Sequence, residues 1–538
     1  MKKKFKIRTI YALCYGLFTS LLFPNNALAN DNFFDKPQEI IGQNFGINNI
    51  EVRGNSIFQT EIESLISEHK NRNVSKTELE EIASKITQLY LNEGYITTRA
   101  VLEEIRGNTA IIQVYEGEIE AIEIQGGGRL ENYVRERVSL GTTSPFNSGK
   151  LEDQLRLLKA DPLIEKIQAT LKPGSRERGS ILEVKVTPSP PLFGNIGINN
   201  NSPPSVGDVE VNLGLGYRNP LGLGDTLSIS YQPRVEDWTG TYSVELNYSV
   251  PVNPMDGRIN ARVSIQENKI VEGPFKPLDI RGETQYYEIN FRQPVLRTPR
   301  EELALSLGLG YRHGQTFTFF GPTPFGIGPD KDGISETSVL TFGQEYVLRE
   351  KTGAWGLRSQ IRVGTGIFGA TKAVIPGAPD GFFVAWLGQV QRIQVLSPDN
   401  ILIIQGDVQI AFDPLLTSEQ FVIGGGDSVR GYRQNVRTGD NGFRFLIEDR
   451  ITLARNENLE PAFQLAPFFN MGSVWNVRGN PNILPDQRFI AALGLGMIWQ
   501  PTRNLNLRLD IAPPLIDLKD RGNNIQDDGF HFSVNYSF

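Results

Sequence analysis

The feature that most constrains this chain is a regular alternation of apolar and polar residues after about residue 190. Thr241 to Val250 (TYSVELNYSV) and Asn504 to Ile511 (NLNLRLDI) each place apolar side chains on one face and polar ones on the other. We count sixteen such segments between Phe193 and Phe538, and many have the about 9 to 11 residues that a tilted membrane strand needs. A soluble sandwich would also alternate, but usually over shorter segments. The pattern therefore predicts a membrane β-barrel of about sixteen antiparallel strands.

The connections between these segments alternate between short turns and long loops, as in outer-membrane barrels. The short ones are 219–225, 251–256, 396–399 and 501–503, and the long ones include 313–336, 369–381 and 413–441. The 54 glycines, 30 phenylalanines and 16 tyrosines suit many strands and tight turns. The last strand, GFHFSVNYSF, aligns Tyr536 with the terminal Phe538 and resembles the C-terminal signal by which bacterial barrels are recognised for assembly.

Residues 1–29 have the basic start, short apolar run and Ala27-Leu28-Ala29 ending of a cleaved secretory signal. Cleavage would remove Cys14, the only cysteine, so we expect no disulfide and no thiol chemistry. It would also leave 49 basic against 61 acidic residues, a net charge near −12. Nucleic acid is therefore not an expected partner.

Before the barrel, the order strand-helix-helix-strand-strand occurs twice. The first copy has segments at 47–52, 60–70, 76–91, 97–105 and 109–115, and the second at 119–124, 131–139, 148–158, 165–171 and 180–186. A proline cluster at 188–191 then interrupts any strand. We expect a short segment at 30–44, two α+β domains at 45–116 and 117–187, and the barrel at 188–538.

The sequence does not favour an enzyme. His69, His313 and His531 show none of the spacings of a zinc site or a catalytic dyad, so we assign no catalytic residue, metal or cofactor. The glycine-rich stretch Gly424 to Tyr432 (GGGDSVRGY) lacks the Gly-Lys-Ser/Thr ending of a phosphate loop and has no helix after it.

Four stretches carry a family resemblance over essentially the whole mature chain. They are GYITTRA (94–100) with IIQVYEGEI (111–119), NPLGLGDT (219–226), the tetrad Val429, Arg430, Gly431 and Tyr432, and FFNMG (468–472) with Phe468, Asn470 and Gly472. These resemble the two-partner secretion transporters, the TpsB family of the FhaC, ShlB and HecB type, in the BamA-like barrel superfamily. The resemblance implies that the two repeats are periplasmic POTRA domains, the second of ShlB type, and that the barrel lies in the outer membrane.

In that family the tetrad arginine lies in a loop folded into the barrel, where it meets an aspartate of the second motif. Here the aspartate position is Asn470, which carries no charge, so we expect a weaker neutral contact. Glu448 shares a strand face with Arg444 and Arg450, and we hypothesise that it supplies the missing charge. The alternative is that several loop carbonyls and water hold Arg430.

The resemblance further implies export of a large secreted partner, a haemolysin- or haemagglutinin-like exoprotein. The POTRA domains would capture its amino-terminal domain, with Tyr95, Ile96, Val101 and Leu102 as candidate contacts that could equally be domain core. We expect a monomer in contact with outer-membrane lipid, inserted by the barrel assembly machinery. Residues 30–44 are too few for the plug helix and linker of many relatives. The alternatives are a BamA-like insertase, which typically has more POTRA repeats, and a passive porin, which explains neither the repeats nor the tetrad.

Overall fold

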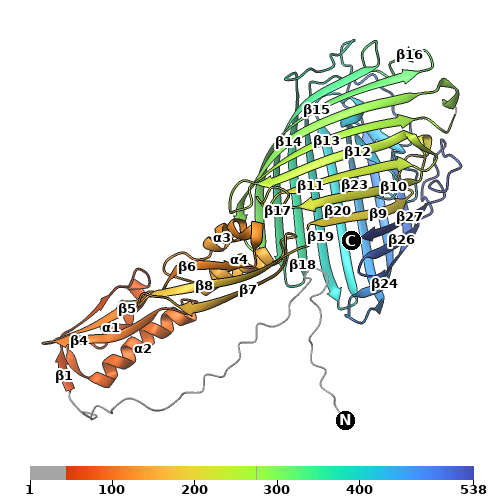
Figure 1. The fold of residues 1–538 in the computed structure, drawn as a ribbon. Helices are drawn as coiled ribbons and strands as arrows, with labels where there is room; N and C mark the ends of the chain where they lie inside the picture. Colours follow the sequence, from red (N-terminus) through yellow and green to blue (C-terminus); the bar gives the residue numbers. More distant parts are fainter. Residues whose placement is uncertain (1–43, 274) are drawn as a thin grey trace, which may run out of the picture. The chain divides into compact units, whose positions relative to one another are not determined.

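The computed structural model describes residues 44–273 and 275–538. The proposed signal sequence and the predicted absence of a plug helix before residue 44 lie outside these residues. Within the described part of the chain, no helix is both long and apolar enough to cross a membrane. The chain divides into two compact units, the described residues up to Ser189 and Pro190–Phe538 (Figure 1).

The first repeat is a three-stranded sheet in the order β2-β5-β4, in which β2 and β5 are parallel. Its elements are β1 (Asn44–Ile47), β2 (Asn49–Arg53), α1 (Gln59–Ser67), β3 (Arg72–Ser75), α2 (Lys76–Asn92), β4 (Arg99–Arg106) and β5 (Thr109–Tyr115). The predicted strand at 47–52 is divided into β1 and β2, and the predicted helix at 60–70 ends at Ser67. The first difference arises because β1 pairs with β3 in a separate two-stranded ribbon.

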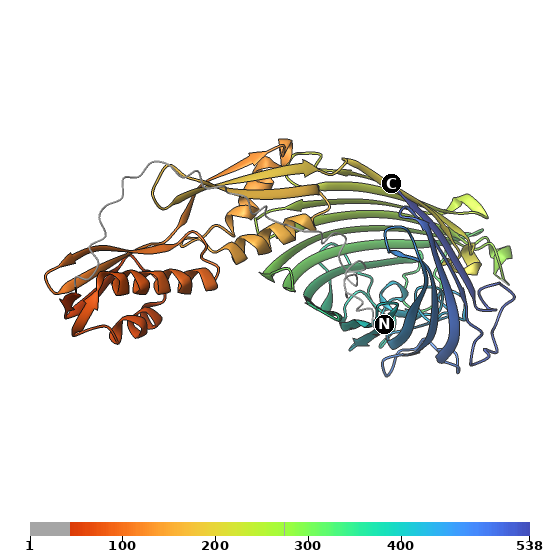
Figure 2. The same ribbon diagram turned by 90° about the horizontal axis from the view of Figure 1, so that it is seen from below.

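The second repeat has the same arrangement, with a sheet in the order β6-β8-β7. Its elements are β6 (Glu118–Gln125), η1 (Gly128–Leu130), α3 (Glu131–Ser139), α4 (Ser148–Lys159), β7 (Ile164–Pro173) and β8 (Gly179–Pro188). In each repeat the helices cover one face of the sheet (Figure 2). The predicted order of strand-helix-helix-strand-strand is confirmed in both copies.

Each repeat has its own apolar core between helices and sheet. In the first, Tyr90 of α2 is fully buried, and its ring meets that of Phe58 edge-on at 5.1 Å. Its hydroxyl donates to Glu116 at 2.6 Å, and Glu116 also accepts from the Ser56 backbone N–H at 2.7 Å. Burial, and then the bond to Glu116, raise the pKa of Tyr90. This network fastens the loop before α1 to the end of β5.

The two repeats join at Gly117 without an intervening linker. A Cβ atom at this position would lie 2.1 Å from Oγ1 of Thr97, so no larger residue fits without a rearrangement. The Gly117 carbonyl accepts from the Phe146 N–H at 2.8 Å, and the Gly94 carbonyl accepts from the Ser148 N–H at 2.9 Å. Backbone hydrogen bonds therefore connect the second repeat directly to the first.

The second unit is a closed barrel, in which β27 pairs with β9 to complete the ring. The sixteen strands predicted from the alternation are confirmed: β9 (Leu192–Asn199), β10 (Glu210–Arg218), β11 (Thr226–Arg234), β12 (Asp237–Pro251), β13 (Arg258–Lys269), β14 (Arg281–Arg297), β15 (Glu301–Thr318), β17 (Ile334–Glu350), β18 (Gly353–Thr365), β19 (Val384–Ser397), β20 (Asn400–Ala411), β23 (Asn441–Arg455), β24 (Pro461–Trp475), β25 (Phe489–Thr502), β26 (Leu505–Ile511) and β27 (Phe530–Ser537). The two-residue β16 (Gly321–Pro322) pairs antiparallel with the end of β15, and η2 (Pro204–Val206) and η3 (Lys276–Leu278) lie in loops.

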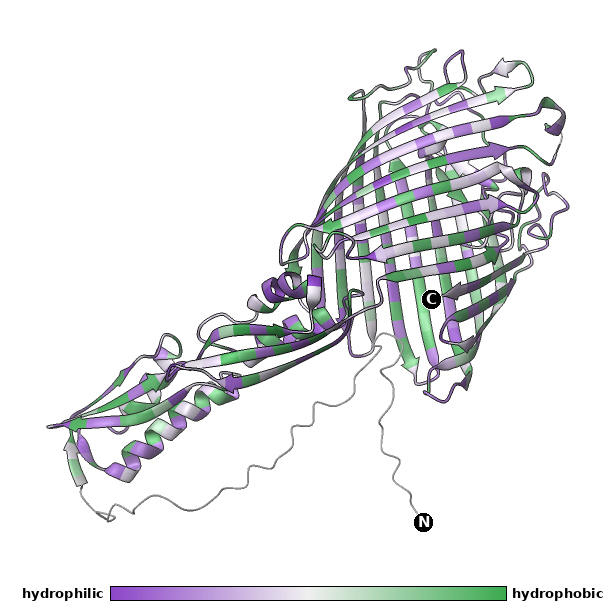
Figure 3. Cartoon of the chain, viewed as in Figure 1, coloured by the Kyte–Doolittle hydropathy of each residue, from purple (hydrophilic) through white to green (hydrophobic). Residues whose placement is uncertain are grey.

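The two faces of the barrel wall differ as the alternation requires. Figure 3 shows apolar and polar residues following one another along the strands. On β10, for example, Leu213, Leu215 and Tyr217 are exposed on the outer face. Exposed apolar side chains on the outside of a closed barrel are what contact with lipid requires.

The short turns are built by their own polar side chains. In the turn between β10 and β11, the fully buried Asp225 accepts from the Leu221 N–H at 3.2 Å and from the Tyr248 hydroxyl at 2.9 Å. Gly222 has φ +86° and Gly224 has φ +77°, a left-handed conformation that other residues adopt only with strain. This is the NPLGLGDT motif, and its glycines and aspartate are needed for the reversal.

Candidate functional site

The connection between β20 and β23, residues 412–440, is here called the lumen loop. It contains η4 (Thr417–Glu419) and a small antiparallel ribbon of β21 (Phe421–Ile423) with β22 (Arg437–Gly439). Apolar side chains of the loop form one buried cluster with inward-facing residues of the wall. Its buried members are Phe421, Ile423, Val429, Tyr432, Phe468, Val474, Ile490, Ala492, Ala512 and Leu518. The loop is therefore packed against the wall inside the barrel.

Arg430 is buried and meets two carboxylates from strands that are not neighbours in the sheet. Its Nη1 lies 2.8 Å from Oε2 of Glu448 on β23 and 3.3 Å from Oδ1 of Asp510 on β26. The side chains of Arg430, Glu448 and Asp510 are 4%, 2% and 6% exposed. The guanidinium also lies over the ring of Phe468, 3.5 Å from its centroid.

Two further arginines complete this group. Arg508 contacts Glu448 at 2.7 Å and Asp510 at 2.8 Å, and Nε of Arg450 lies 2.7 Å from Glu448. We call Arg430, Glu448, Arg450, Arg508 and Asp510 the Arg430 cluster. Positive and negative groups alternate in it, so each buried carboxylate has at least two cationic partners.

Asn470 holds the backbone of Arg430, not its guanidinium. Its buried amide, oriented to satisfy both of its groups, donates to the Arg430 carbonyl at 3.2 Å and accepts from the Arg430 N–H at 3.1 Å. An aspartate could accept but not donate here. Asparagine thus positions the tetrad through the main chain, while Glu448 and Asp510 supply the charge.

The remaining tetrad residues seat the loop closely against β25 and the segment after β26. Gly431 has φ +108°, and a Cβ atom there would lie 2.6 Å from both Cβ of Ala492 and the Ala512 carbonyl. The Tyr432 hydroxyl donates to the carbonyl of Ala491 at 2.8 Å, and Val429 is fully buried. A glycine followed by a tyrosine is therefore required by close approach and by hydrogen bonding.

Two arginines beyond the tetrad tie the loop to the long connection between β26 and β27. Arg433 Nε lies 2.8 Å from Asp527, and Arg437 donates to both carboxylate oxygens of Asp520 at 2.7 and 2.9 Å. The hydrogen bonds from Arg437 lower the pKa of Asp520. The C-terminal half of the loop is therefore fastened at several independent points.

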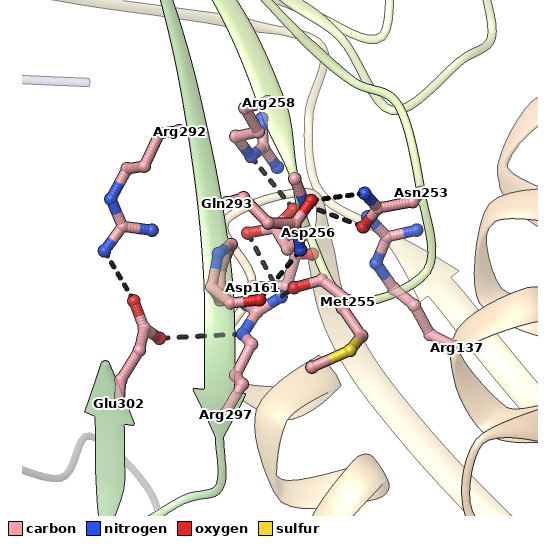
Figure 4. A network of polar contacts seen from close by, with 12 residues as sticks. Arg137, Asp161, Asn253, Met255, Asp256, Arg258, Arg292, Gln293, Arg297 and Glu302 are labelled. Atoms are coloured by element: carbon pink, nitrogen blue, oxygen red, sulfur yellow. Dashed lines mark hydrogen bonds and ion pairs between the residues drawn. The ribbon is translucent and has the colours of Figure 1, made fainter. Parts of the chain in front are cut away.

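The wall at the short-turn end carries another network of charges, shown in Figure 4. Asp256 pairs with Arg258 at 2.9 Å and with Arg297 at 3.1 Å. Glu302 pairs with Arg292 at 2.6 Å and with Arg297 at 3.6 Å. Arginines paired with carboxylates thus occur at the short-turn end of the wall as well as at the lumen loop.

The residues named from sequence fall at three separate places. Val429 to Tyr432, Phe468, Asn470, Gly472 and Glu448 come together at the lumen loop, where a Cβ atom on Gly472 would lie 3.3 Å from Val429. In the first repeat, Ile96 and Val101 are exposed, whereas Tyr95 and Leu102 pack against the core. Tyr536 and Phe538 lie at the closing β27, and Phe538 exchanges two backbone hydrogen bonds of 3.0 Å with Gly194.

Sequence reasoning did not identify Asp510 and Arg508. The signal was present, because alternation in NLNLRLDI places both on the polar face of their strand. What the sequence did not contain is their distance from Arg430. Among residues 44–273 and 275–538, no group of three or more His, Cys, Asp or Glu side chains could hold a metal ion.

Tandem strand-helix-helix-strand-strand domains before a sixteen-stranded barrel, with an arginine loop packed inside it, define the class of outer-membrane barrels that carry POTRA domains. The chain belongs to the family described as haemolysin secretion/activation protein ShlB/FhaC/HecB, whose signature matches residues 178–497. The signature of the ShlB-type POTRA domain matches residues 45–117, which is the first repeat. The barrel therefore lies in the outer membrane, and the POTRA domains lie in the periplasm.

Individual relatives are distant in sequence. The outer membrane transporter CdiB of Escherichia coli is 28% identical over 35% of this chain, and the match spans about a third (32%) of that relative. The heme/hemopexin transporter protein HuxB of Haemophilus influenzae is 21% identical over 85% of this chain and 80% of its own length.

Solved structures agree on the fold over nearly the whole chain. The structure of CdiB from Escherichia coli matches with a TM-score of 0.72 and 19% identity, over 94% of this chain and 93% of that one. BamA from Haemophilus ducreyi lacking POTRA domains 1–3 matches with a TM-score of 0.56 and 16% identity, over 92% and 100%. The fold predicted from the alternation and the repeats is confirmed.

Proposed function

We propose that this protein is the transporter of a two-partner secretion pair and carries one large secreted exoprotein across the outer membrane. The observation that carries the proposal is the lumen loop, whose tetrad is packed inside a closed barrel preceded by two POTRA domains. A passive porin needs neither feature. A loop held by buried ion pairs can be displaced by a passing chain and can return afterwards.

Recognition of the exoprotein is assigned to the first POTRA domain. Its β4 is an edge strand of the sheet, with unpaired backbone groups along one side. Val101 lies on this strand and Ile96 just before it, and their apolar side chains are 40% and 49% exposed. An extended segment of the exoprotein can add to β4 as a further strand and cover both side chains.

The proposed cargo is a haemolysin- or haemagglutinin-like exoprotein. One relative is described as a hemolysin transporter and another as a heme/hemopexin transporter, so the family serves more than one kind of cargo. The sequence has no nucleotide-binding motif. We therefore assign the driving force to folding of the exoprotein outside the cell, which prevents it from sliding back.

Export by cells that carry the native chain or an Arg430→Ala variant tests this function. We expect one large protein that cells with the native chain secrete to be missing from the medium of cells with Arg430→Ala, while the variant barrel remains folded in the outer membrane. The native chain should also co-purify with that protein, and Val101→Asp should weaken the co-purification. A general loss of other outer-membrane barrels on deletion of this chain would instead identify an insertase and overturn the proposal.

A further inference from the structure

The lumen loop has a second buried charge, near its other end. Glu419, at the end of η4, has a side chain that is 4% exposed. It belongs to none of the sequence motifs of the tetrad region and lies eleven positions before Arg430. A buried carboxylate requires charged or hydrogen-bonding partners, because burial removes its hydration.

The partners of Glu419 come from a part of the wall that the Arg430 cluster does not touch. The Thr337 hydroxyl on β17 donates to Oε1 at 3.0 Å, and Arg362 on β18 donates to Oε2. Arg312 on β15 lies 4.0 Å away. We call these four residues the Glu419 contact. Here the loop supplies the anion and the wall the cations, the opposite of the arrangement at Arg430 and Glu448.

The two contacts lie on different sides of the loop's point of attachment. In the sheet, β15, β17 and β18 precede β19 and β20, whereas β23 to β26 follow the loop. The loop is therefore fastened to the wall in both directions from its base. A chain passing the loop must release at least one of the two fastenings.

The fastenings differ in strength. The side of Arg430 combines the buried cluster, the Asn470 bonds, the Tyr432 hydroxyl and the Arg433 and Arg437 pairs. On the other side, side-chain polar contact to the strands before β19 is made by Glu419 alone among the described loop residues, beside a backbone bridge between Leu415 and Asp380 and the apolar packing of Leu415. The wall arginines are equally solvated on both sides, since Arg362 and Arg312 are 23% and 29% exposed and Arg508 and Arg450 are 22% and 36% exposed. The difference therefore lies in the number of contacts and in the burial of Arg430, which is 4% exposed.

We propose that the Glu419 contact is the releasable fastening of the lumen loop, and that the passage opens between the loop and the strands β15 to β18. The Arg430 side remains in place and acts as the fixed attachment. The proposal rests on the proposed function for its purpose, since it names the side on which an exoprotein passes. Glu419 is accordingly a positioning residue of the loop.

Two single-cysteine reporters distinguish the two sides of the loop. Leu416 and Val429 are 2% and 0% exposed, one beside each fastening. The only cysteine in the sequence, Cys14, lies in the proposed signal sequence, so its cleavage would leave each reporter as the sole thiol. Purified full-length protein in lipid vesicles is treated with a charged maleimide. In Glu419→Gln we expect the cysteine at position 416 to be labelled roughly tenfold faster, because one charged hydrogen bond that holds this side of the loop is lost. The cysteine at position 429 should keep the labelling rate that it has without this substitution. Ser418→Ala, an exposed neighbour, is the matched control.

Equal acceleration at positions 416 and 429, or no acceleration at 416, would overturn the proposal. Arg362→Gln removes the same contact from the wall and should reproduce the result, so a folding defect of one variant does not decide the outcome. Adding Arg362→Gln to Glu419→Gln should produce little further change, because both remove one interaction. The labelling needs no exoprotein, so its result is independent of whether the proposed transport function holds.

Discussion

Replacing Glu448 with glutamine should release the lumen loop from the wall. Glu448 has Arg430, Arg450 and Arg508 as partners, and it is 2% exposed. Loss of one member of a buried ion pair costs about 3 to 5 kcal/mol. Asp510 remains as a second acceptor at 3.3 Å, so we expect the lower end of this range, about 3 kcal/mol. Since about 1.4 kcal/mol changes an equilibrium tenfold, the released state should gain roughly 100-fold in population.

Planar-bilayer conductance of the purified barrel measures this population as the fraction of time spent in open states. Secretion should fall about as much in Glu448→Gln as in Arg430→Ala. Glu350→Gln is the matched control, because Glu350 pairs with Arg392 at 2.7 Å but is 42% exposed, so its loss should cost only about 0 to 1 kcal/mol. Native conductance and secretion in Glu448→Gln, with a folded barrel, would show that this carboxylate does not hold the loop.

Three further substitutions test separate parts of the structure. Asn470→Leu keeps the size of the side chain but removes both hydrogen bonds to the Arg430 backbone. We expect the free energy that holds the lumen loop to the wall to fall by about 2 to 4 kcal/mol, which planar-bilayer recordings would show as more frequent opening. Native gating would contradict the assigned amide contacts. Gly431→Ala places a methyl group 2.6 Å from Ala492, so the loop should leave its seat and become accessible to protease, whereas a protected loop would refute the close approach. Leu79→Ala in the buried core of the first POTRA domain should lower its free energy of unfolding by about 2 to 5 kcal/mol, measured by denaturant titration of the full chain; an unchanged midpoint would mean that Leu79 is not core.

Much of the fold was predictable because it depends on local regularities. The period of two along TYSVELNYSV shows which side chains face lipid before any strand pairing is known. Helical spacing at 76–91 located α2 correctly to within one residue. The division of 47–52 into β1 and β2 was not predictable, because it depends on pairing with Arg72–Ser75, a segment with no strand signal of its own.

The lumen loop shows where sequence reasoning ends. Alternation could place Glu448 and Asp510 on polar faces, and the family tetrad directed attention to Arg430. Only the tertiary structure determines that β23 and β26, which have β24 and β25 between them in the sheet, both present a carboxylate to one guanidinium. For Glu419, in a loop without periodicity, no residue pattern indicates a partner on β17 or β18.

By itself, the sequence determined the number of barrel strands, which face each strand presents to lipid, and which loop bears the tetrad, although the predicted loop at 313–336 includes the ends of β15 and β17. These follow from backbone geometry, which repeats every two residues regardless of what lies opposite. The tertiary structure alone decided how the loop is held: Asn470 binds the backbone, two carboxylates share Arg430, and Glu419 reaches the other part of the wall. The physical reason is that such contacts depend on register and curvature accumulated around the whole ring, which no short stretch of sequence contains.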